Sequence, residues 1–578
     1  SDSKSVTQIK MENEPSLIKE EKIMIPEKQI AIQLIGPDEL VLNNEKEVHK
    51  PGPHQILGKV ESVGLCFSDM KLLHAFTEHP RKGPIIEGID PKILDEIPSY
   101  VPNELPTVPG HEAVVEIVAV GDGVKDYKVG ERYLVQTDYR HLPTDGSKAA
   151  FGYNFEGALQ QYVLMDERII TAPDGESFLI PVTEEPSASA VALVEPWACV
   201  EDAYVTNERQ TIKEKGKVII VKDGGDYDLQ GLFPKTPKSV TAVGLSDKEK
   251  TQIESELGKT NVKPVFADEI PEGLFDDIIY LGNKKETFEL LEKTRLAEQG
   301  LMNTATAGRK IGEPVMIDVG RIHYEGTRFI GTASNKPAEA YKHIPSSGEI
   351  PDGSDVLIIG AAGPMGTMHT IRSLSLSPSV KSIIATDINN DRMAMLERTV
   401  KSLADRKGIP FSLYNPKEKG NYQGKANYAI YLIPAHQILP PVIHNLKCCG
   451  ILNIFAGIRA GSFAPIDMDY YVNNSLYMIG TSGSTIEDMR IVLGKVDQNV
   501  MDTNTSVAAI SGMKGAIEGL RGVDSQRFHG KVIVYPQLPE LGLIELDNLS
   551  EVMPDVAKLL KDGVWTKEAE SALLSKTS

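Results

Sequence analysis

The segment from Asp355 to Gly366 constrains the fold of this chain most, because it joins an apolar strand to a glycine-rich turn. It reads Asp-Val-Leu-Ile-Ile-Gly-Ala-Ala-Gly-Pro-Met-Gly, and residues 367–374 can continue as a helix. This order is typical of a βαβ unit in a parallel sheet, whose helix N-terminus binds a pyrophosphate. The pattern predicts a Rossmann sheet with these turn residues against a dinucleotide: Gly360, Gly363, Pro364, Met365 and Gly366.

A second apolar run, residues 382–386, ends in Asp387 about 20 residues beyond the turn. An acid at that place is suited to hold the 2′-hydroxyl of an adenosine ribose, whereas it would repel a 2′-phosphate. Asp387 could equally be a cap at the end of a strand. We expect NAD(H) as the cofactor, with NADP(H) less favoured.

Four residues offer the donor atoms of a catalytic zinc site. They are Cys66 in Gly-Leu-Cys-Phe-Ser-Asp, His111 and Glu112 in Pro-Gly-His-Glu, and Glu195 in Leu-Val-Glu-Pro. Catalytic zinc takes about three protein ligands and keeps a position open, and the ion acts as a Lewis acid toward a hydroxyl or carbonyl. Each residue has a plain alternative: a packed cysteine, a surface His-Glu pair, and a carboxylate that caps a helix.

Residues 213–347 contain a weaker copy of the pattern around the glycine turn. Residues 278–281, 300–303 and 329–334 match residues 429–432, 450–453 and 478–483, at offsets of 151, 150 and 149. A nearly constant offset indicates an internal repeat. The copy has Lys222-Asp-Gly-Gly where the glycine turn should stand, and Gly244 replaces Asp387. We expect it to keep the sheet and to have lost dinucleotide binding.

Composition excludes several classes of partner. The net charge of −20 argues against nucleic acid and against an anionic membrane. Four cysteines, two of them adjacent, make no disulfide framework, so a reducing cytoplasm is expected. Residues 1–27 are expected to form a mobile polar tail without the apolar core of a signal peptide, and no run in the chain is long enough to cross a bilayer.

The zinc and glycine-turn motifs resemble those of the zinc-dependent medium-chain dehydrogenase/reductase family, in its polyol branch. Further matches are Gly-Tyr-Asn-Phe-Glu-Gly at 152–157, Phe-Ala-Gly at 455–457 and Ile-Gly-Thr-Ser-Gly at 479–483. The resemblance covers roughly residues 28–212 and 348–578. Two departures stand out: Ala361 occupies the first glycine position of the usual turn, and no cysteine lies between Cys66 and Cys199 to form the family's structural zinc lobe. One catalytic zinc and no structural zinc follow.

The resemblance also implies roles for individual residues. Cys66, His111 and Glu112 would bind zinc, and Glu195 would bind it or hold its water. The hydroxyl of Ser68 would relay the substrate proton. Catalysis is thereby expected from Cys66, Ser68, His111 and Glu195. Further cofactor contacts are implied at these residues: Arg392, Gly457, Thr481 and Ser482.

These patterns predict an α/β chain with a GroES-like, β-rich catalytic domain and a doubly wound Rossmann domain, into which a second, degenerate Rossmann-like domain is inserted. The expected boundaries are residues 28–212 with 497–578 for the catalytic domain, 213–347 for the insert and 348–496 for the NAD-binding domain. The insert is a candidate to cap the edge of the NAD-binding sheet, through which relatives dimerise. It could also be a spacer that packs elsewhere.

The predicted activity is hydride transfer between NAD(H) and a secondary alcohol or ketone of a polyol, sugar or sugar phosphate. Two alternatives remain open: a zinc enzyme that uses its NAD transiently for elimination or epimerisation of a sugar, and a non-catalytic nucleotide-binding protein. The expected partner is a small molecule. The chain could be a homo-oligomer, or a monomer if the insert caps the dimer edge.

Overall fold

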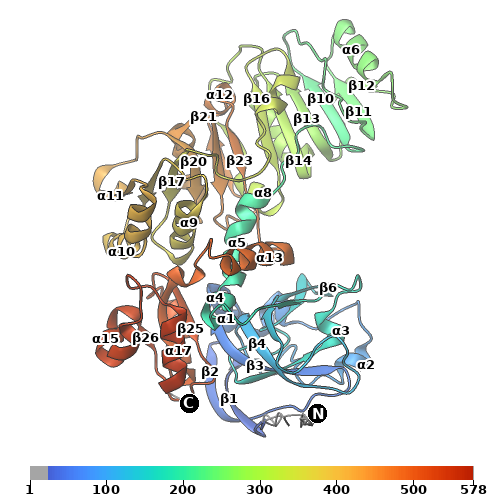
Figure 1. Cartoon of the computed structure of the whole chain (residues 1–578). Helices are drawn as coiled ribbons and strands as arrows, with labels where there is room; N and C mark the ends of the chain where they lie inside the picture. The colour runs from blue at the N-terminus through green and yellow to red at the C-terminus, as the bar shows by residue number, and fades with distance from the viewer. Residues whose placement is uncertain (1–23, 577–578) are drawn as a thin grey trace, which may run out of the picture.

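The computed structural model describes residues 24–576 and contains three large sheets. In Figure 1 the β-rich part lies at the bottom, a parallel sheet lies above it, and a second parallel sheet lies at the upper right. The tail predicted over residues 1–27 lies mostly outside the described residues. Within the described part, Ile25 packs against a small apolar cluster that contains Leu57, Val118 and Leu164. None of the helices in residues 24–576 combines the length and apolarity that crossing a bilayer requires.

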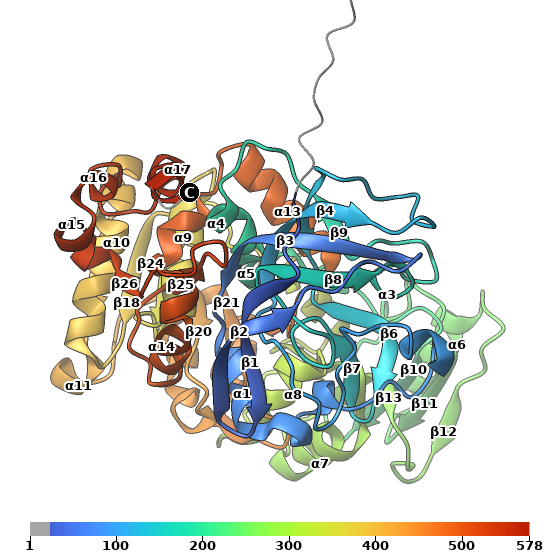
Figure 2. The same cartoon turned by 90° about the horizontal axis from the view of Figure 1, so that it is seen from below.

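The β-rich part is built from two distant stretches of the chain. Its central strands are β3 (Gln55–Gly64) and β4 (Glu112–Val120), which pair antiparallel. Figure 2 shows β25 (Lys531–Val534) from the C-terminal region beside β3, with Ile533 opposite Gly64. The C-terminal segment therefore completes the sheet that begins near the N-terminus. The other strands of this sheet are β5 (Arg132–Val135), β8 (Tyr162–Asp166), β9 (Leu179–Pro181), β24 (Val507–Ser511) and β26 (Ile544–Glu545).

The cofactor sheet is the parallel sheet formed by residues 355–479. Its order is β19-β18-β17-β20-β21-β23, so the strand order reverses beside the first strand, which is where doubly wound sheets bind ligands. Helices α9 (Pro364–Ser375) and α10 (Asn390–Lys407) follow the first two strands in sequence. The strands are β17 (Asp355–Ile359), β18 (Ser382–Thr386), β19 (Phe411–Tyr414), β20 (Ala426–Tyr431), β21 (Leu446–Ile454) and β23 (Tyr477–Ile479).

The insert sheet repeats this topology, as the sequence predicted. Its order is β12-β11-β10-β13-β14-β16, which is the cofactor sheet strand for strand, and all of its pairs are parallel. Two helices have no counterpart: no helix lies between β10 and β11, where the cofactor sheet has α9, and none lies between β12 and β13, where it has the short α11 (Pro416–Lys419). The strands are β10 (Lys217–Lys222), β11 (Ser239–Val243), β12 (Val265–Ala267), β13 (Phe275–Leu281), β14 (Leu296–Ala305) and β16 (Arg328–Thr332).

A pseudo-two-fold axis relates the two parallel sheets. Strand β15 (Val315–Asp318) pairs antiparallel with β22 (Phe463–Ile466). Met316 lies opposite Pro465, which is its own equivalent at an offset of 149 residues. The same offset converts the flanking pair Val315–Ile466 into the other flanking pair, Ile317–Ala464. Self-complementary pairing of this kind is the signature of an isologous interface between two copies of one fold.

The helices after these strands repeat the symmetry. Asp318 caps α8 (Val319–Tyr324) and Asp467 caps α12 (Met468–Asn473), with ψ angles of 89° and 88°. A methyl group added at Gly331 would lie 2.5 Å from Val472, and one added at Gly480 would lie 2.9 Å from His323. The two contacts are equivalent, because an offset of 149 relates Gly331 to Gly480 and His323 to Val472. The insert thus covers the free edge of the cofactor sheet. The exact domain boundaries stay a prediction.

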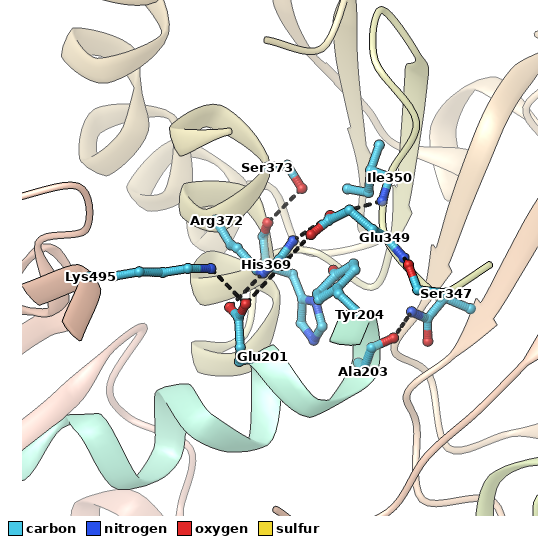
Figure 3. A network of polar contacts seen from close by, with 12 residues as sticks. Glu201, Ala203, Tyr204, Ser347, Glu349, Ile350, His369, Arg372, Ser373 and Lys495 are labelled. Atoms are coloured by element: carbon cyan, nitrogen blue, oxygen red, sulfur yellow. Dashed lines mark hydrogen bonds and ion pairs between the residues drawn. The ribbon is translucent and has the colours of Figure 1, made fainter. Parts of the chain in front are cut away.

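Helix α5 (Val194–Val205) joins the β-rich part to the cofactor sheet. The buried Arg372 of α9 donates to Glu201 of α5 at 3.0 and 3.2 Å, and to Glu349 at 2.9 and 2.8 Å (Figure 3). Lys495 of α13 (Ile486–Asp497) binds the same Glu201 at 2.6 Å. The Arg372 guanidinium also lies 3.8 Å from the centre of the Tyr204 ring. These buried charges hold α5 and the first cofactor helix as one unit.

The remaining elements are the β1–β2 hairpin, the β6–β7 hairpin and the other helices. Their bounds are β1 (Lys28–Gly36), β2 (Glu39–Glu47), β6 (Asp138–Thr144), β7 (Ser147–Ala150), α1 (Phe67–Ala75), α2 (Pro91–Leu94), α3 (Glu167–Ile170), α4 (Ala188–Ala192), α6 (Asp247–Leu257), α7 (Lys285–Arg295), α11 (Pro416–Lys419), α14 (Met513–Asp524), α15 (Leu549–Val552), α16 (Pro554–Ala557) and α17 (Lys567–Lys576). The 3₁₀ helices are η1 (Phe76–Glu78), η2 (Pro80–Lys82), η3 (Pro337–His343), η4 (His436–Ile438), η5 (Pro440–Asn445), η6 (Thr503–Ser506) and η7 (Leu546–Asn548).

Candidate metal and cofactor site

Cys66, His111 and Glu112 lie together at the ends of two paired strands. One donor atom from each falls within 4.8 Å of the others. Cys66 follows β3 and caps α1, while His111 and Glu112 begin β4, whose first residue lies opposite Gly64. A methyl group at position 64 would come within 2.2 Å of a Glu112 oxygen, so the strand needs glycine there. The pairing of β3 with β4 brings the three predicted donors together.

Asp69 orients two of these donors, and the sequence reasoning missed it. Its Oδ1 lies 3.0 Å from Nδ1 of His111, and its Oδ2 accepts from the backbone N–H of Cys66 at 3.0 Å. Burial lowers the pKa of His111, but Asp69 and Tyr153 more than offset this, so the pKa lies well above its usual value in the metal-free protein. The Cys-x-x-Asp spacing of a capping box was the available signal.

Lys531 is a second contact that no sequence motif indicated. It reaches Glu112 Oε1 at 2.6 Å from a strand 419 residues away, and both side chains are buried. Burial lowers the pKa of Lys531, but the charge of Glu112 raises it by more. The pKa of Lys531 therefore lies above its ordinary value. The other oxygen, Glu112 Oε2, is buried without a hydrogen-bond partner among residues 24–576. A buried carboxylate oxygen left unpaired is costly, so its place beside a thiol and an imidazole fits a metal ligand.

Glu195 lies in the first turn of α5 and is outside the group of three donors. Burial raises its pKa to about 7, His111 lowers it and Glu112 raises it, so these charges lie within electrostatic range of one another. Ser68 lies beside Cys66, with 3.4 Å between the sulfur and the hydroxyl oxygen. The structure thus gathers the predicted set at one place. Its role as a zinc site stays a prediction.

The segment from Phe76 to Leu105 borders this site through aromatic contacts. The His79 ring lies 5.1 Å from the ring of Tyr153, which lies 5.7 Å from the ring of His111. His74 points elsewhere, because its two nitrogens contact Asp38 and Asp524. Arg140 is paired with Asp174 and Glu176.

The glycine turn has the close packing that a bound pyrophosphate requires. Gly360 has φ +80°, which favours glycine, and a methyl group at Gly366 would lie 2.3 Å from the carbonyl oxygen of Ala361. Gly363 and Pro364 open α9, a helix of 12 residues. Met365 packs partly buried against the core. The turn leaves its helix N-terminus free to face an anion.

Asp387 and Arg392 flank the turn. Oδ2 of Asp387 accepts from the N–H of Ala362 at 3.0 Å, and Oδ1 accepts from Ile388 and Asn389. Arg392 Nε has no hydrogen-bond partner in the described part of the chain, and the same guanidinium lies 3.1 Å from where a Cβ at Gly363 would stand. An unpaired buried guanidinium nitrogen beside a glycine cradle fits a bound phosphate or ribose.

Gly457, Thr481 and Ser482 lie at the carboxyl ends of β21 and β23. A Cβ at Gly457 would be 3.1 Å from the hydroxyl of Tyr324, which belongs to the insert. Thr481 and Ser482 line a cavity of about 530 Å³ between the two parallel sheets. The insert offers no equivalent nucleotide site: Asp223 follows β10 and bonds Tyr280, and the Arg309 guanidinium lies against Gly224 and Gly225.

Comparisons with known proteins agree with this geometry. Residues 52–174 match the family model described as the alcohol dehydrogenase GroES-like domain. The chain is 26% identical over 291 residues to mannitol-1-phosphate 5-dehydrogenase of Aliivibrio fischeri, which covers 46% of this chain and 65% of that protein, just under two thirds. It is 27% identical over 287 residues to (R,R)-butanediol dehydrogenase of Bacillus subtilis, covering 46% and 75%.

Two further similarities complete the comparison. L-sorbose 1-phosphate reductase of Klebsiella pneumoniae is 27% identical over 247 residues, which cover 41% of this chain and 58% of that protein. Among solved structures, 2R,3R-butanediol dehydrogenase from Bacillus subtilis aligns with 88% of this chain and 100% of its own, at 15% identity and a TM-score of 0.49. A TM-score at that level carries no argument about function.

Proposed function

Since this chain belongs to the zinc-type medium-chain dehydrogenase/reductase family, we propose that it transfers a hydride between NAD(H) and the secondary alcohol or ketone of a polyol, sugar or sugar phosphate. The observation that carries the proposal is the cluster of Cys66, His111 and Glu112, with one buried carboxylate oxygen unpaired. Helix α5 ties this cluster to the first helix of the glycine turn.

A zinc ion and a dinucleotide both fit the residues present. A zinc ion would be held by Cys66, His111 and Glu112, with Glu195 as a further ligand or as holder of its water, and it would supply Lewis acidity toward the substrate oxygen. A dinucleotide would lie on the glycine turn with its ribose at Asp387 and Arg392, and it would supply the hydride acceptor.

The protein's own residues prepare this chemistry. Asp69 holds the proton of His111 on Nδ1, which leaves Nε2 as a donor atom. Lys531 balances the charge of Glu112 in a buried place and fixes its orientation. The hydroxyl of Ser68 stands beside the Cys66 sulfur. It would take the proton of the substrate hydroxyl while it passes its own proton on toward solvent. The rate would depend on geometry, because the residues that hold the substrate must also place its carbinol carbon near the hydride acceptor.

The test measures metal, cofactor and turnover separately. The purified chain should contain one zinc per polypeptide and should oxidise members of a panel of polyols, sugars and sugar phosphates with NAD⁺ in preference to NADP⁺. Cys66→Ser should lose the zinc and lower kcat by at least about 100-fold. NADH should still bind to this variant, as measured by quenching of the protein fluorescence. A chain that binds zinc and NADH but turns over no alcohol or ketone would contradict the proposal.

The covered edge of the cofactor sheet supports a second part of the proposal, on assembly. The insert pairs with it through β15 and β22 and through the Gly331 and Gly480 contacts, so a second chain has no free edge strand to meet there. We therefore expect a monomer in solution. Light scattering that gives twice the mass of the chain would contradict this expectation.

A further inference from the structure

A cavity of about 530 Å³ lies where the insert meets the carboxyl end of the cofactor sheet. Its walls come from the insert, the cofactor sheet, α5 and the segment that follows α5, which contributes residues 206–209. The insert contributes His323, Tyr324 and Arg328, the cofactor sheet contributes Thr481 and Ser482, and α5 contributes Asp202. No part of the repeat alone forms this cavity. It exists because the two sheets pack around their pseudo-two-fold axis.

The cavity borders the expected cofactor contacts Thr481 and Ser482, and helix α5 links it to the proposed zinc donors. Asp202 stands seven residues beyond Glu195 on the same helix, which at 1.5 Å per residue is about 10 Å. Asp202 and Thr481, one of the expected cofactor contacts, both line the cavity. On the opposite wall, the Tyr324 hydroxyl lies 3.1 Å from the Cβ position of Gly457, another expected contact. A substrate held at the zinc donors could therefore extend its far end into this space.

The positive charges around the cavity are already paired. Arg328 donates to Glu208 at 2.9 Å and to the carbonyl oxygen of Gly480 at 3.0 Å. Arg209 binds Asp277 at 2.6 Å, and Lys213 binds Asp276 at 2.6 Å. A phosphate group would have to compete with carboxylates for each of them. The cavity is therefore poorly suited to a doubly charged anion.

Neutral donors and acceptors remain. Tyr324 is 49% exposed, and its hydroxyl makes no hydrogen bond within the described residues. Nδ1 of the neighbouring His323 donates to the carbonyl oxygen of Ile454 at 3.1 Å, so Nε2 of the same ring is an acceptor. With the hydroxyls of Thr481 and Ser482, these groups suit a chain of hydroxyl groups.

We infer that the insert forms one wall of the substrate cleft, and that Tyr324, with His323, binds the hydroxylated tail of a neutral polyol or sugar. The inference rests on the proposed function and deepens it. The copy that lost its nucleotide site has in this way gained a role in selecting the substrate. The insert thereby supplies Tyr324 to the substrate cleft of the cofactor domain, which has no such residue of its own.

The test compares substrates of different length in the full-length, zinc-loaded enzyme. Tyr324→Phe removes one oxygen and keeps the ring. It should raise KM for six-carbon polyols (D-sorbitol, D-mannitol, galactitol) by about ten-fold and leave KM for 2,3-butanediol within about two-fold. Zinc content, NADH Kd and the unfolding midpoint should not change. Leu290→Ala, at an exposed site on the insert helix α7 and outside the cavity lining, is the matched control and should leave every value unchanged.

Each other outcome overturns the inference. Equal losses for long and short substrates would mean a structural role for Tyr324. An unchanged KM for six-carbon polyols in an active enzyme would refute the subsite while leaving the proposed function intact. If Tyr324→Phe raised KM more for a phosphorylated substrate than for a neutral substrate of the same length, the assignment of a neutral tail would be refuted. A wild-type chain without dehydrogenase activity would overturn the proposed function together with the inference.

Discussion

The cofactor sheet and the insert sheet have the same strand order, yet only one of them retains the features of a nucleotide site. In the cofactor sheet the first strand ends in a turn that opens a helix of 12 residues. In the insert the first strand is followed by Asp223, and no helix lies between it and β11. The strands of both sheets bury apolar residues in the same way. The comparison teaches that the sheet is sustained by packing, whereas binding depends on a few residues at one turn.

The largest expected effect concerns the helix that the insert lacks. Arg372→Met in α9 should lower the free energy of unfolding by about 3–5 kcal/mol, because it leaves Glu201 buried with only Lys495 as partner. Denaturant unfolding would measure it. Arg309→Met, whose guanidinium bonds Gly224 and Tyr227 in the insert, should cost only about 1–2 kcal/mol. Equal losses of unfolding free energy in the two variants would show that β17 and β10, the first strands of the two sheets, are anchored equally.

A pH effect should distinguish the insert sheet from the cofactor sheet. Burial raises the pKa of Glu292 in α7 to about 7, and the equivalent segment of the cofactor sheet, η5, carries no acid. The folded protein then binds more protons than the unfolded chain between pH about 4.5 and 7. Stability from this group is therefore present at low pH and is lost as pH rises toward 7, by roughly 3 kcal/mol at pH 8.

Glu292→Gln should remove this dependence. The difference in unfolding free energy between the variant and the wild type should grow in favour of the variant from pH 5 to pH 8, as followed by urea titrations at several pH values. A difference that stays constant over this range would mean that Glu292 titrates normally.

The glycine turn can be tested against its counterpart. Gly366→Ala places a methyl group 2.3 Å from the Ala361 carbonyl oxygen, so the turn must open and NADH binding should weaken about 100-fold. Fluorescence titration would measure the Kd. Asp223→Asn, at the same place in the insert, should leave the Kd unchanged. If Asp223→Asn weakened binding instead, the insert would be the nucleotide site.

The smallest expected effect is on cofactor choice. Asp387→Ser removes the carboxylate that would repel a 2′-phosphate, so the preference for NAD⁺ over NADP⁺ should fall about ten-fold in kcat/KM. Gly244, which takes the place of Asp387 in the insert, has no such role, and Gly244→Ala should leave the preference as it is. An unchanged ratio in Asp387→Ser would mean that the ribose lies elsewhere.

Much of the fold followed from local patterns. The apolar strand before the glycine turn, the acid after the next strand and the offsets near 150 predicted two parallel sheets, and both are present. Cys66, His111 and Glu112 could be grouped by motif, and the pairing of β3 with β4 brings them together. Lys531 could not be found, because its contact with Glu112 spans 419 residues and its strand has no distinctive pattern.

The sequence by itself determined the elements, the donor set and the loss of the turn in the insert, because these depend on residue type and short spacing. Only the tertiary structure decided that the two copies meet about a pseudo-two-fold axis, that Tyr324 reaches Gly457, and that Arg372 lies between two glutamates. Such contacts join side chains that are distant in the sequence. They form where apolar faces pack and where buried charges must find partners, and no local pattern records either requirement.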